Sequence, residues 1–226
     1  LRNRGAPTWG VFHIKQLNGG GPLIDIGVHA LDVTMWLMGS PRPVAVFGAT
    51  YMALAHRPGL KNRMGTINVE EYDVEDLAAA LVRFDNGATL MLETSWLLQM
   101  TERGNAYTQL FGTEGSARLD PFQIVRDVDG APEDVTPELP PPAPDPPPQQ
   151  PKPPAPAAED ASAGVEVAPV EKAVTWRRQP SVERFVQAAL GRAEPLVKPE
   201  ETLNVQRVMD ALYQSAATGQ LVEITD

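Results

Sequence analysis

GGGPLIDIGVHALDVTMWLMG, residues 19–39, predicts one long helix around which the rest of the chain is organised. Pro22 suits the first helical position, where its missing N–H needs no partner, and the glycines before it give a flexible approach. Gly39 suits a left-handed helix end, and Pro41 prevents continuation. Because apolar residues surround this helix on almost all sides, we expect it to be buried.

Three ionisable residues interrupt this apolar helix. Asp25 and His29 are four residues apart and Asp32 follows three later, so at about 100° per residue they form one stripe. Burying such groups is costly unless they are paired or used, so the stripe is a candidate site. Gly27 lies between Asp25 and His29, where a ligand or another backbone could approach closely. The structural alternative is a satisfied helix contact with no chemical role.

The same run resembles the signature of the Gfo/Idh/MocA family (glucose–fructose oxidoreductase, inositol dehydrogenase and rhizopine catabolism proteins). The resemblance covers most of the chain apart from its proline-rich middle, and only the family's C-terminal domain. It implies an NAD(P)-dependent oxidoreductase that transfers a hydride between nicotinamide and a sugar, polyol or related hydroxy compound. The family's general acid/base maps onto His29, and an imidazole suits that role because it titrates near neutral pH. The family's Asp maps onto Asp25, which would hold a substrate hydroxyl.

Four further residues are weaker candidates for substrate or supporting contacts: Asp32, Gly27, Lys15 and Trp96. Asp32 is expected to support His29. Lys15 could touch an anionic ligand, although a solvated surface position is the simpler interpretation. Trp96 could reach a ligand from the end of a predicted strand, although core packing is the simpler interpretation there.

Neither the dinucleotide fingerprint G-x-G-x-x-G nor the family's Glu-Lys-Pro motif occurs in the chain. The resemblance places both motifs in a preceding Rossmann domain. We therefore assign no cofactor-binding residue here and expect NAD or NADP to be bound mainly by that domain, in cis or in trans. The chain begins at Leu1 rather than Met, which fits a truncated protein, and alone it is expected to be inactive. The resemblance also implies a homo-oligomer formed through the open face of the sheet.

Two rival hypotheses stay open. In the first, the chain is a non-catalytic orphan domain that serves oligomerisation or assembly, with Asp25 and His29 as relics. In the second, Asp25, His29 and Asp32 ligate a metal. Neither His13 nor His56 lies at a ligand spacing from His29, so no metal site is assigned.

Composition excludes several classes of function. The 226 residues carry a formal net charge of −10, which argues against a general nucleic-acid binder. No apolar run approaches the ~20 residues of a membrane span. The chain has no cysteine, so disulfides and thiolate metal sites are excluded. The lack of cysteine and of a signal pattern fits a cytoplasmic protein.

Strands and helices are segregated along the chain. Strands are expected over 43–53, 76–84, 88–96, 106–111, 116–119 and 122–128, and helices over 181–190 and from Pro199 to Gly219. Asp85-Asn86-Gly87 predicts a tight hairpin turn. The fold class is therefore α+β, an open and mainly antiparallel sheet with helices on one face.

The proline-rich stretch over 131–168 is expected to be a disordered insertion or linker, because such proline density excludes helices and central strands. Residues 1–130 and 169–226 would then form a single domain for substrate binding and oligomerisation.

Overall fold

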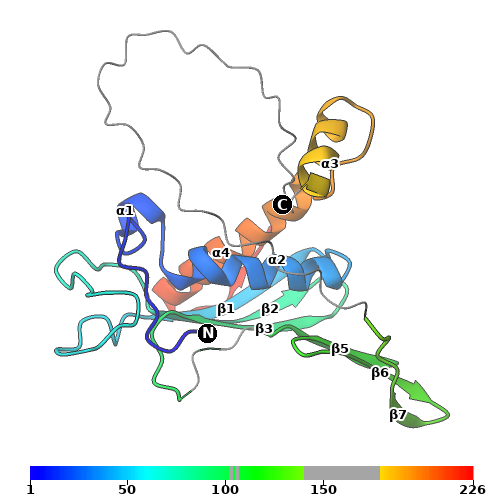
Figure 1. Ribbon diagram of the computed structural model, residues 1–226, viewed down its shortest axis with the longest axis horizontal. Coiled ribbons are helices and arrows are strands. Elements are labelled where there is room, and N and C mark those ends of the chain that lie inside the picture. The colour runs from blue at the N-terminus through cyan, green and yellow to red at the C-terminus, as the bar shows by residue number, and fades with distance from the viewer. Residues whose placement is uncertain (102–103, 105–106, 140–178, 226) are drawn as a thin grey trace, which may run out of the picture. The chain divides into compact units, whose positions relative to one another are not determined.

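The computed structural model describes residues 1–101, 104, 107–139 and 179–225 (Figure 1). These residues fall into two compact units, one of Leu1–Thr136 with Val197–Asp226 and one of Pro137–Leu196. The second unit contains helix α3, Gln179–Ala189, close to the predicted helix over 181–190. The first unit contains the candidate site.

In chain order, the elements of the first unit are α1 (Lys15–Asn18), η1 (Leu23–Gly27), α2 (Val28–Leu37), β1 (Pro43–Tyr51), β2 (Leu77–Phe84), β3 (Thr89–Ser95), β4 (Gln109–Gly112), β5 (Gly115–Leu119), β6 (Phe122–Val128), β7 (Ala131–Asp134), α4 (Pro199–Thr218) and β8 (Val222–Glu223). The strands form two antiparallel sheets, ordered β3-β2-β1-β8 and β4-β5-β6-β7. The α+β class and the antiparallel pairing are confirmed, although the strands divide between two sheets where one was expected.

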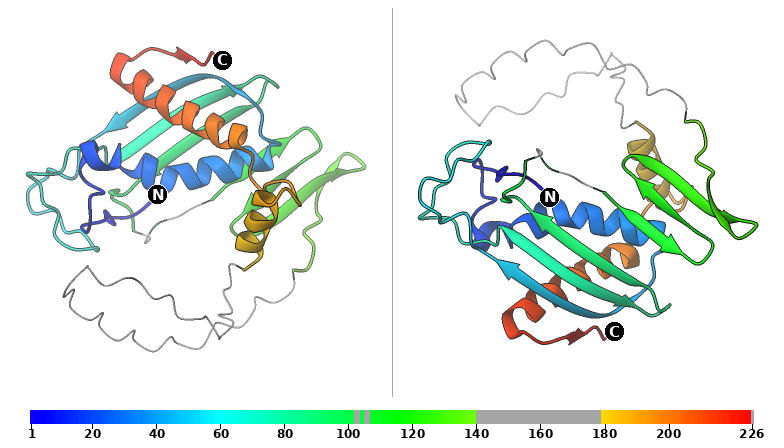
Figure 2. Two further views of the ribbon diagram at one scale, coloured as in Figure 1. Left: turned by 90° about the horizontal axis from the view of Figure 1, so that it is seen from above. Right: turned by 90° about the horizontal axis from the view of Figure 1, so that it is seen from below.

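Helices cover one face of the sheet β3-β2-β1-β8 (Figure 2). Helix α4 packs over β1 and beside α2, while η1 packs on β3. The close approach of α4 requires Gly48 on β1, since a Cβ there would lie 2.7 Å from Leu212 Cγ. The main core lies between these layers and includes Leu31, Met35, Val46, Val82, Leu92, Val208 and Leu212.

The hairpin of β2 and β3 follows its sequence pattern. Leu90, Leu92 and Thr94 of β3 are buried, while Thr89, Met91 and Glu93 on the opposite face are exposed. Gly87 adopts a φ of +85° in the turn, which is the left-handed conformation that a glycine allows. The side chains of β3 therefore alternate between a buried and an exposed face up to Thr94, and no described helix covers the exposed face (Figure 2).

One predicted boundary is wrong. The linker was expected to begin at Ala131, but Ala131–Asp134 forms β7 and pairs with β6 in the register Val128↔Ala131. Asp129 and Gly130 both have positive φ, as in a two-residue type I′ hairpin turn. This local turn signal outweighs the proline-rich composition that follows it. The stretches 140–168 and 169–178 lie outside the described residues, as does the predicted strand start at 106.

Candidate functional site

The helix that carries the candidate residues begins with a π-turn. Leu23–Gly27 is π-helical, and the Val28 N–H donates to Leu23 O, five residues back. The regular 100° step assumed between Asp25 and His29 is therefore wrong, because a π-turn holds one more residue than an α-turn. Such π-bulges are found frequently at functional sites.

The far end of the helix matches the sequence expectation. Gly39 has a φ of +81°. Its N–H donates to Trp36 O at 3.0 Å, and the Ser40 N–H donates to Met35 O at 2.8 Å. These two bonds form a Schellman motif, which satisfies the last carbonyls of α2.

The glycines before the helix are required by close packing, so the expected flexible approach is wrong. A Cβ on Gly20 would lie 2.0 Å from Tyr213 Oη, and a Cβ on Gly21 would lie 2.1 Å from the backbone oxygen of Glu75. The Leu23 N–H and the Tyr213 hydroxyl both donate to Glu75 Oε1, at 3.2 and 2.9 Å. Burial and the nearby Glu75 raise the pKa of Tyr213, so its hydroxyl remains a donor. Buried Glu75 thus ties the start of the helix to α4.

Asp25 lies in the π-turn and is held from two sides. Trp96 Nε1–H donates to Asp25 Oδ2 at 2.9 Å, and Arg2 Nη1 lies 3.6 Å from the same oxygen. The Asp25 side chain is 20% exposed, whereas Trp96 is fully buried. Trp96 therefore orients Asp25 from within the core, the position that the simpler, packing interpretation expected.

Arg2 is a site residue that the sequence did not single out. It lies in the segment before α1, and its backbone N–H donates to Ser95 O at 2.8 Å. That bond places its guanidinium beside Asp25, 23 positions further along the sequence. No local pattern indicates this pairing, because the two residues belong to separate elements.

Gly27 faces the sheet. A Cβ there would lie 2.9 Å from Thr94 Cγ2 on β3, and the Thr94 hydroxyl donates to Pro22 O at 3.1 Å. Gly27 thus permits close helix–strand packing. The sequence allowed either a ligand or another element at this position, and the structure places Thr94 there.

His29 and Asp32 lie on the exposed face of α2, followed by Trp36 at 57% exposure. The expectation of a helix buried almost all round is wrong, because within the described residues α2 buries only one face, which includes Leu31 and Met35. No hydrogen bond in the described part of the chain joins His29 to Asp25 or Asp32. An exposed imidazole is accessible to a substrate hydroxyl.

Lys15 begins α1 and is exposed, and its backbone N–H donates to Asp73 Oδ1. No described contact links its side chain to Asp25 or His29. Among the residues that the structure describes, no three His, Cys, Asp or Glu side chains come together as a metal-ligand group. None of the described helices combines the length and apolar character needed to cross a membrane.

Comparison with known proteins shows what this chain is similar to. The family model "Oxidoreductase family, C-terminal alpha/beta domain" matches residues 1–224. D-glucoside 3-dehydrogenase of Escherichia coli (strain K12) is 31% identical over 224 residues, which cover 99% of this chain and 54% of that protein. D-xylose 1-dehydrogenase (NADP(+)) 2 of Haloferax volcanii is 25% identical over 205 residues, 91% of this chain and 48% of that protein. The chain thus spans about half the length of these curated relatives.

Solved structures share the fold. An NAD binding oxidoreductase from Klebsiella pneumoniae matches with a TM-score of 0.66 and 21% identity, covering 100% of this chain and 57% of that one. Levoglucosan dehydrogenase in complex with NADH and L-sorbose matches with a TM-score of 0.63 and 21% identity, covering 100% and 55%. The chain therefore belongs to the Gfo/Idh/MocA oxidoreductase family, whose C-terminal alpha/beta domain it matches over nearly its whole length.

Proposed function

We propose that this chain is the catalytic and substrate-binding part of an NAD(P)-dependent dehydrogenase that acts on a sugar, a polyol or a related hydroxy compound. The observation that carries the proposal is the exposed imidazole of His29, two residues beyond a π-turn in which Asp25 is fixed by Trp96 and Arg2. The sugar dehydrogenases among the relatives support the substrate class.

His29 acts as the general acid/base. When an alcohol carbon gives up its hydride, the attached hydroxyl must also lose its proton, and a positioned imidazole accepts that proton. In the reverse direction, the imidazolium returns it to the carbonyl oxygen. Nicotinamide, when bound, supplies the hydride acceptor or donor.

Asp25 orients the substrate. Both side-chain polar contacts of Asp25 within the described residues are made to Oδ2, so Oδ1 is the oxygen left for a substrate hydroxyl. The buried Trp96 and the Arg2 guanidinium fix the carboxylate before substrate arrives, which reduces the entropy lost on binding. Asp32 follows His29 by three residues on the exposed face of α2 and takes a supporting role.

Within the described residues, the glycines that precede the helix do not form a cradle for the cofactor phosphates. Gly20 and Gly21 are the glycines that precede a helix, but Tyr213 and Glu75 fill the space above them. A nucleotide-binding domain, in cis or in trans, is therefore the proposed holder of NAD or NADP.

A turnover assay tests this function. Reduction of NAD+ and NADP+ is followed with a panel of glucosides, free sugars and polyols, first with the chain alone and then with a nucleotide-binding domain supplied. We expect no turnover by the chain alone and turnover of at least one hydroxy compound by the combination. Turnover by the isolated chain would contradict the proposal that a separate nucleotide-binding domain holds the cofactor. Inactivity of the chain together with that domain on every compound would contradict the proposed dehydrogenase function.

The uncovered sheet face favours assembly as an accompanying function. Phe47, Leu81 and Met91 are cross-strand neighbours on β1, β2 and β3, and they are 51%, 44% and 84% exposed. The view from below in Figure 2 shows this face without a covering helix. A contiguous apolar patch of this kind marks an interaction surface, and we assign it to a second copy of the chain.

Leu81→Lys tests this assembly. The charged side chain lies at the centre of the patch, where it would be buried without a partner between two copies, so we expect the oligomer to dissociate into smaller species. Light scattering coupled to size-exclusion chromatography measures the mass. Leu17→Lys is the matched control, because Leu17 is 63% exposed on α1, away from the sheet. An unchanged mass for Leu81→Lys would rule out this face as the interface.

A further inference from the structure

The Arg2 guanidinium is only partly occupied by the contacts that it makes. Nη1 lies 3.6 Å from Asp25 Oδ2 and donates to Gly5 O at 3.5 Å. Both contacts use this one nitrogen, so within the described residues Nε and Nη2 make no hydrogen bond. The Arg2 side chain is 32% exposed. Because a guanidinium carries five N–H donors in a fixed fork, donors remain available beside Asp25.

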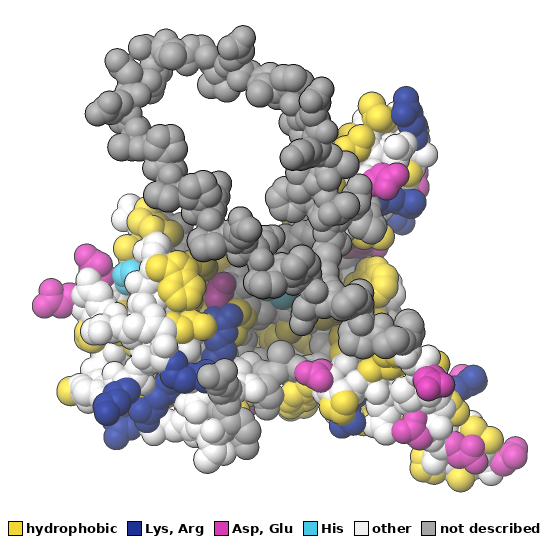
Figure 3. Space-filling model, viewed as in Figure 1, with side chains coloured by type: hydrophobic (Ala, Val, Ile, Leu, Met, Phe, Trp, Pro, Cys, Tyr) yellow, Lys and Arg dark blue, Asp and Glu magenta, His cyan; other side chains and the backbone are white. Residues whose placement is uncertain are grey.

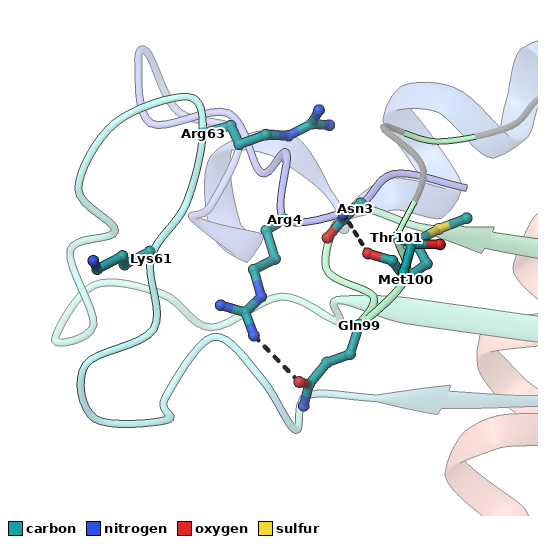
Figure 4. A pocket seen from close by; sticks show the side chains of 7 residues that line it. All are labelled: Asn3, Arg4, Lys61, Arg63, Gln99, Met100 and Thr101. Carbon is teal, nitrogen blue, oxygen red and sulfur yellow. Dashed lines mark hydrogen bonds between the residues drawn. The ribbon is translucent and has the colours of Figure 1, made fainter.

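Hydrogen bonds hold Arg2 against the end of β3 and the segment that follows it. The Arg2 N–H donates to Ser95 O at 2.8 Å. The next residue adds a side-chain bond, from Asn3 Nδ2 to Met100 O (Figure 4). Trp96 directly follows Ser95, so Trp96 and Arg2 approach the candidate carboxylate from one hydrogen-bonded framework. Little backbone freedom of Arg2 would therefore be lost when a ligand binds.

The contact between Arg2 and Asp25 is an ion pair without a direct hydrogen bond, since 3.6 Å exceeds the roughly 2.7–3.2 Å of an N–H···O bond. The Trp96 indole, by contrast, donates to the same oxygen at 2.9 Å. A pair that served only to link two segments would gain more from a bidentate geometry. Instead, the acceptor Oδ1 of Asp25 remains beside the donors of Arg2, and both side chains are partly exposed.

This arrangement of one acceptor beside several donors matches two neighbouring hydroxyl groups. A hydroxyl both donates and accepts, so one hydroxyl can donate to Asp25 Oδ1 while the next accepts from Nε or Nη2 of Arg2. The Asp25 carboxylate, 3.6 Å away, balances the charge of the guanidinium, which favours a neutral ligand over an anion. Hydrogen bonds to charged groups are stronger than those between neutral groups, so the second hydroxyl adds substantially to the affinity.

We infer that Arg2 is a substrate-binding residue that selects, together with Asp25, compounds with hydroxyl groups on two adjacent carbons. The inference deepens the proposed function and rests on it for the reaction, in which His29 takes the proton. A compound with a single hydroxyl meets only one of the two side chains. Sugars and polyols carry hydroxyls on adjacent carbons and can meet both, so the pair discriminates them from simple alcohols.

Ligand-observed NMR titrations of the full chain test this inference without any turnover. The probes are trans-1,2-cyclohexanediol, trans-1,3-cyclohexanediol and cyclohexanol, which differ in the number and spacing of their hydroxyls. We expect the 1,2-diol to bind at least ~10-fold more tightly than the other two, since a hydrogen bond to a charged group contributes about that factor or more. Arg2→Met should reduce this preference to within about twofold, because methionine keeps a long side chain but has no N–H donor.

Arg4→Met is the matched control. Lys and Arg side chains gather in one band on the face drawn in Figure 3, so a cation from the same segment is the appropriate comparison. Arg4 lies two residues from Arg2, but its Nη2 donates to Gln99 Oε1 at 3.2 Å (Figure 4). Arg4→Met should therefore keep the preference for the 1,2-diol. An equal loss of preference in both variants overturns the inference.

The remaining outcomes separate the alternatives. Equal affinity for the three probes, or a 1,2-diol preference that survives Arg2→Met, overturns the inference. Equal weakening of all three probes by Arg2→Met also overturns it, in favour of a residue that only positions Asp25. Tighter binding of cyclohexanecarboxylate than of the 1,2-diol would overturn it in favour of an anionic ligand. A preference that is lost in Arg2→Met, while His29→Asn leaves turnover intact, would leave this inference standing and contradict the proposed function.

Discussion

His29→Asn, introduced into the protein together with its nucleotide-binding domain, should lower kcat by roughly 10²–10⁴-fold, the range expected for loss of a general acid/base. Asparagine is close to histidine in size but cannot accept a proton near neutral pH. The His29 side chain is exposed on α2 and makes no hydrogen bond within the described residues, so the substitution should leave the fold and the KM largely unchanged. Initial rates of nicotinamide reduction, over a range of sugar concentrations and of pH, separate the two parameters.

His56→Asn is the matched control. His56 is also exposed, in the loop between β1 and β2, where its ring meets Tyr72 edge to face with centroids 6.1 Å apart. The same chemical change should therefore leave kcat within about twofold of the unmodified protein. If both variants retain full turnover at all pH values, His29 does not transfer the proton, and the orphan assembly hypothesis gains support.

Gly21→Ala should destabilise the chain by about 3 kcal/mol, the upper part of the range for overpacking a buried position. The added Cβ would lie 2.1 Å from the backbone oxygen of Glu75 and 3.1 Å from Val74 Cγ2. A backbone atom cannot rotate away, so the start of the helix must move. Because Gly21 O accepts the N–H groups of Ile24 and Asp25, each at 3.1 Å, this movement should also displace Asp25. Urea unfolding followed by circular dichroism measures the loss of stability.

Gly112→Ala is the control for this prediction. Gly112 lies at the end of β4, and a Cβ there would meet only Gly115 O, at 3.6 Å. Its φ is not among the positive values, so the change should shift the free energy of unfolding by less than about 0.5 kcal/mol. Equal free energies of unfolding for the two variants would contradict the close packing of Gly21 against the Glu75 backbone that the structure shows.

Much of the secondary structure could be predicted because its signals are local. Gly39 and Gly219 end their helices with φ of +81° and +68°, as glycines in the left-handed conformation commonly do. Residues 122–128 form β6 as predicted. The family signature likewise lies in one continuous run, so Asp25 and His29 could be selected as candidates from the sequence.

The sequence pattern misled where a contact joined distant segments. The glycines at 20 and 21 indicated flexibility, yet Tyr213 on α4 and Glu75, just before β2, leave no room for a side chain there. A single π-turn changes the spacing of only a few residues, and this helix start is apolar at most of its positions, so periodicity could not reveal it. Similarly, the composition of α2, which is apolar on almost all sides, could not show that only one of its faces is buried.

The sequence alone determined the fold class and the ends of the main helix, because caps, turn residues and periodicity act over a few neighbouring positions. It also supplied the two residues proposed to meet the substrate, because the family signature that carries them is one continuous run. Tertiary structure alone decided how those residues are held. The Trp96 indole reaches Asp25 from 71 positions away, Arg2 reaches it from a separate segment, and Thr94 occupies the space that Gly27 leaves. These contacts depend on how β3 packs against the helix, since the chain must fold before residues so far apart in sequence can come within hydrogen-bonding distance.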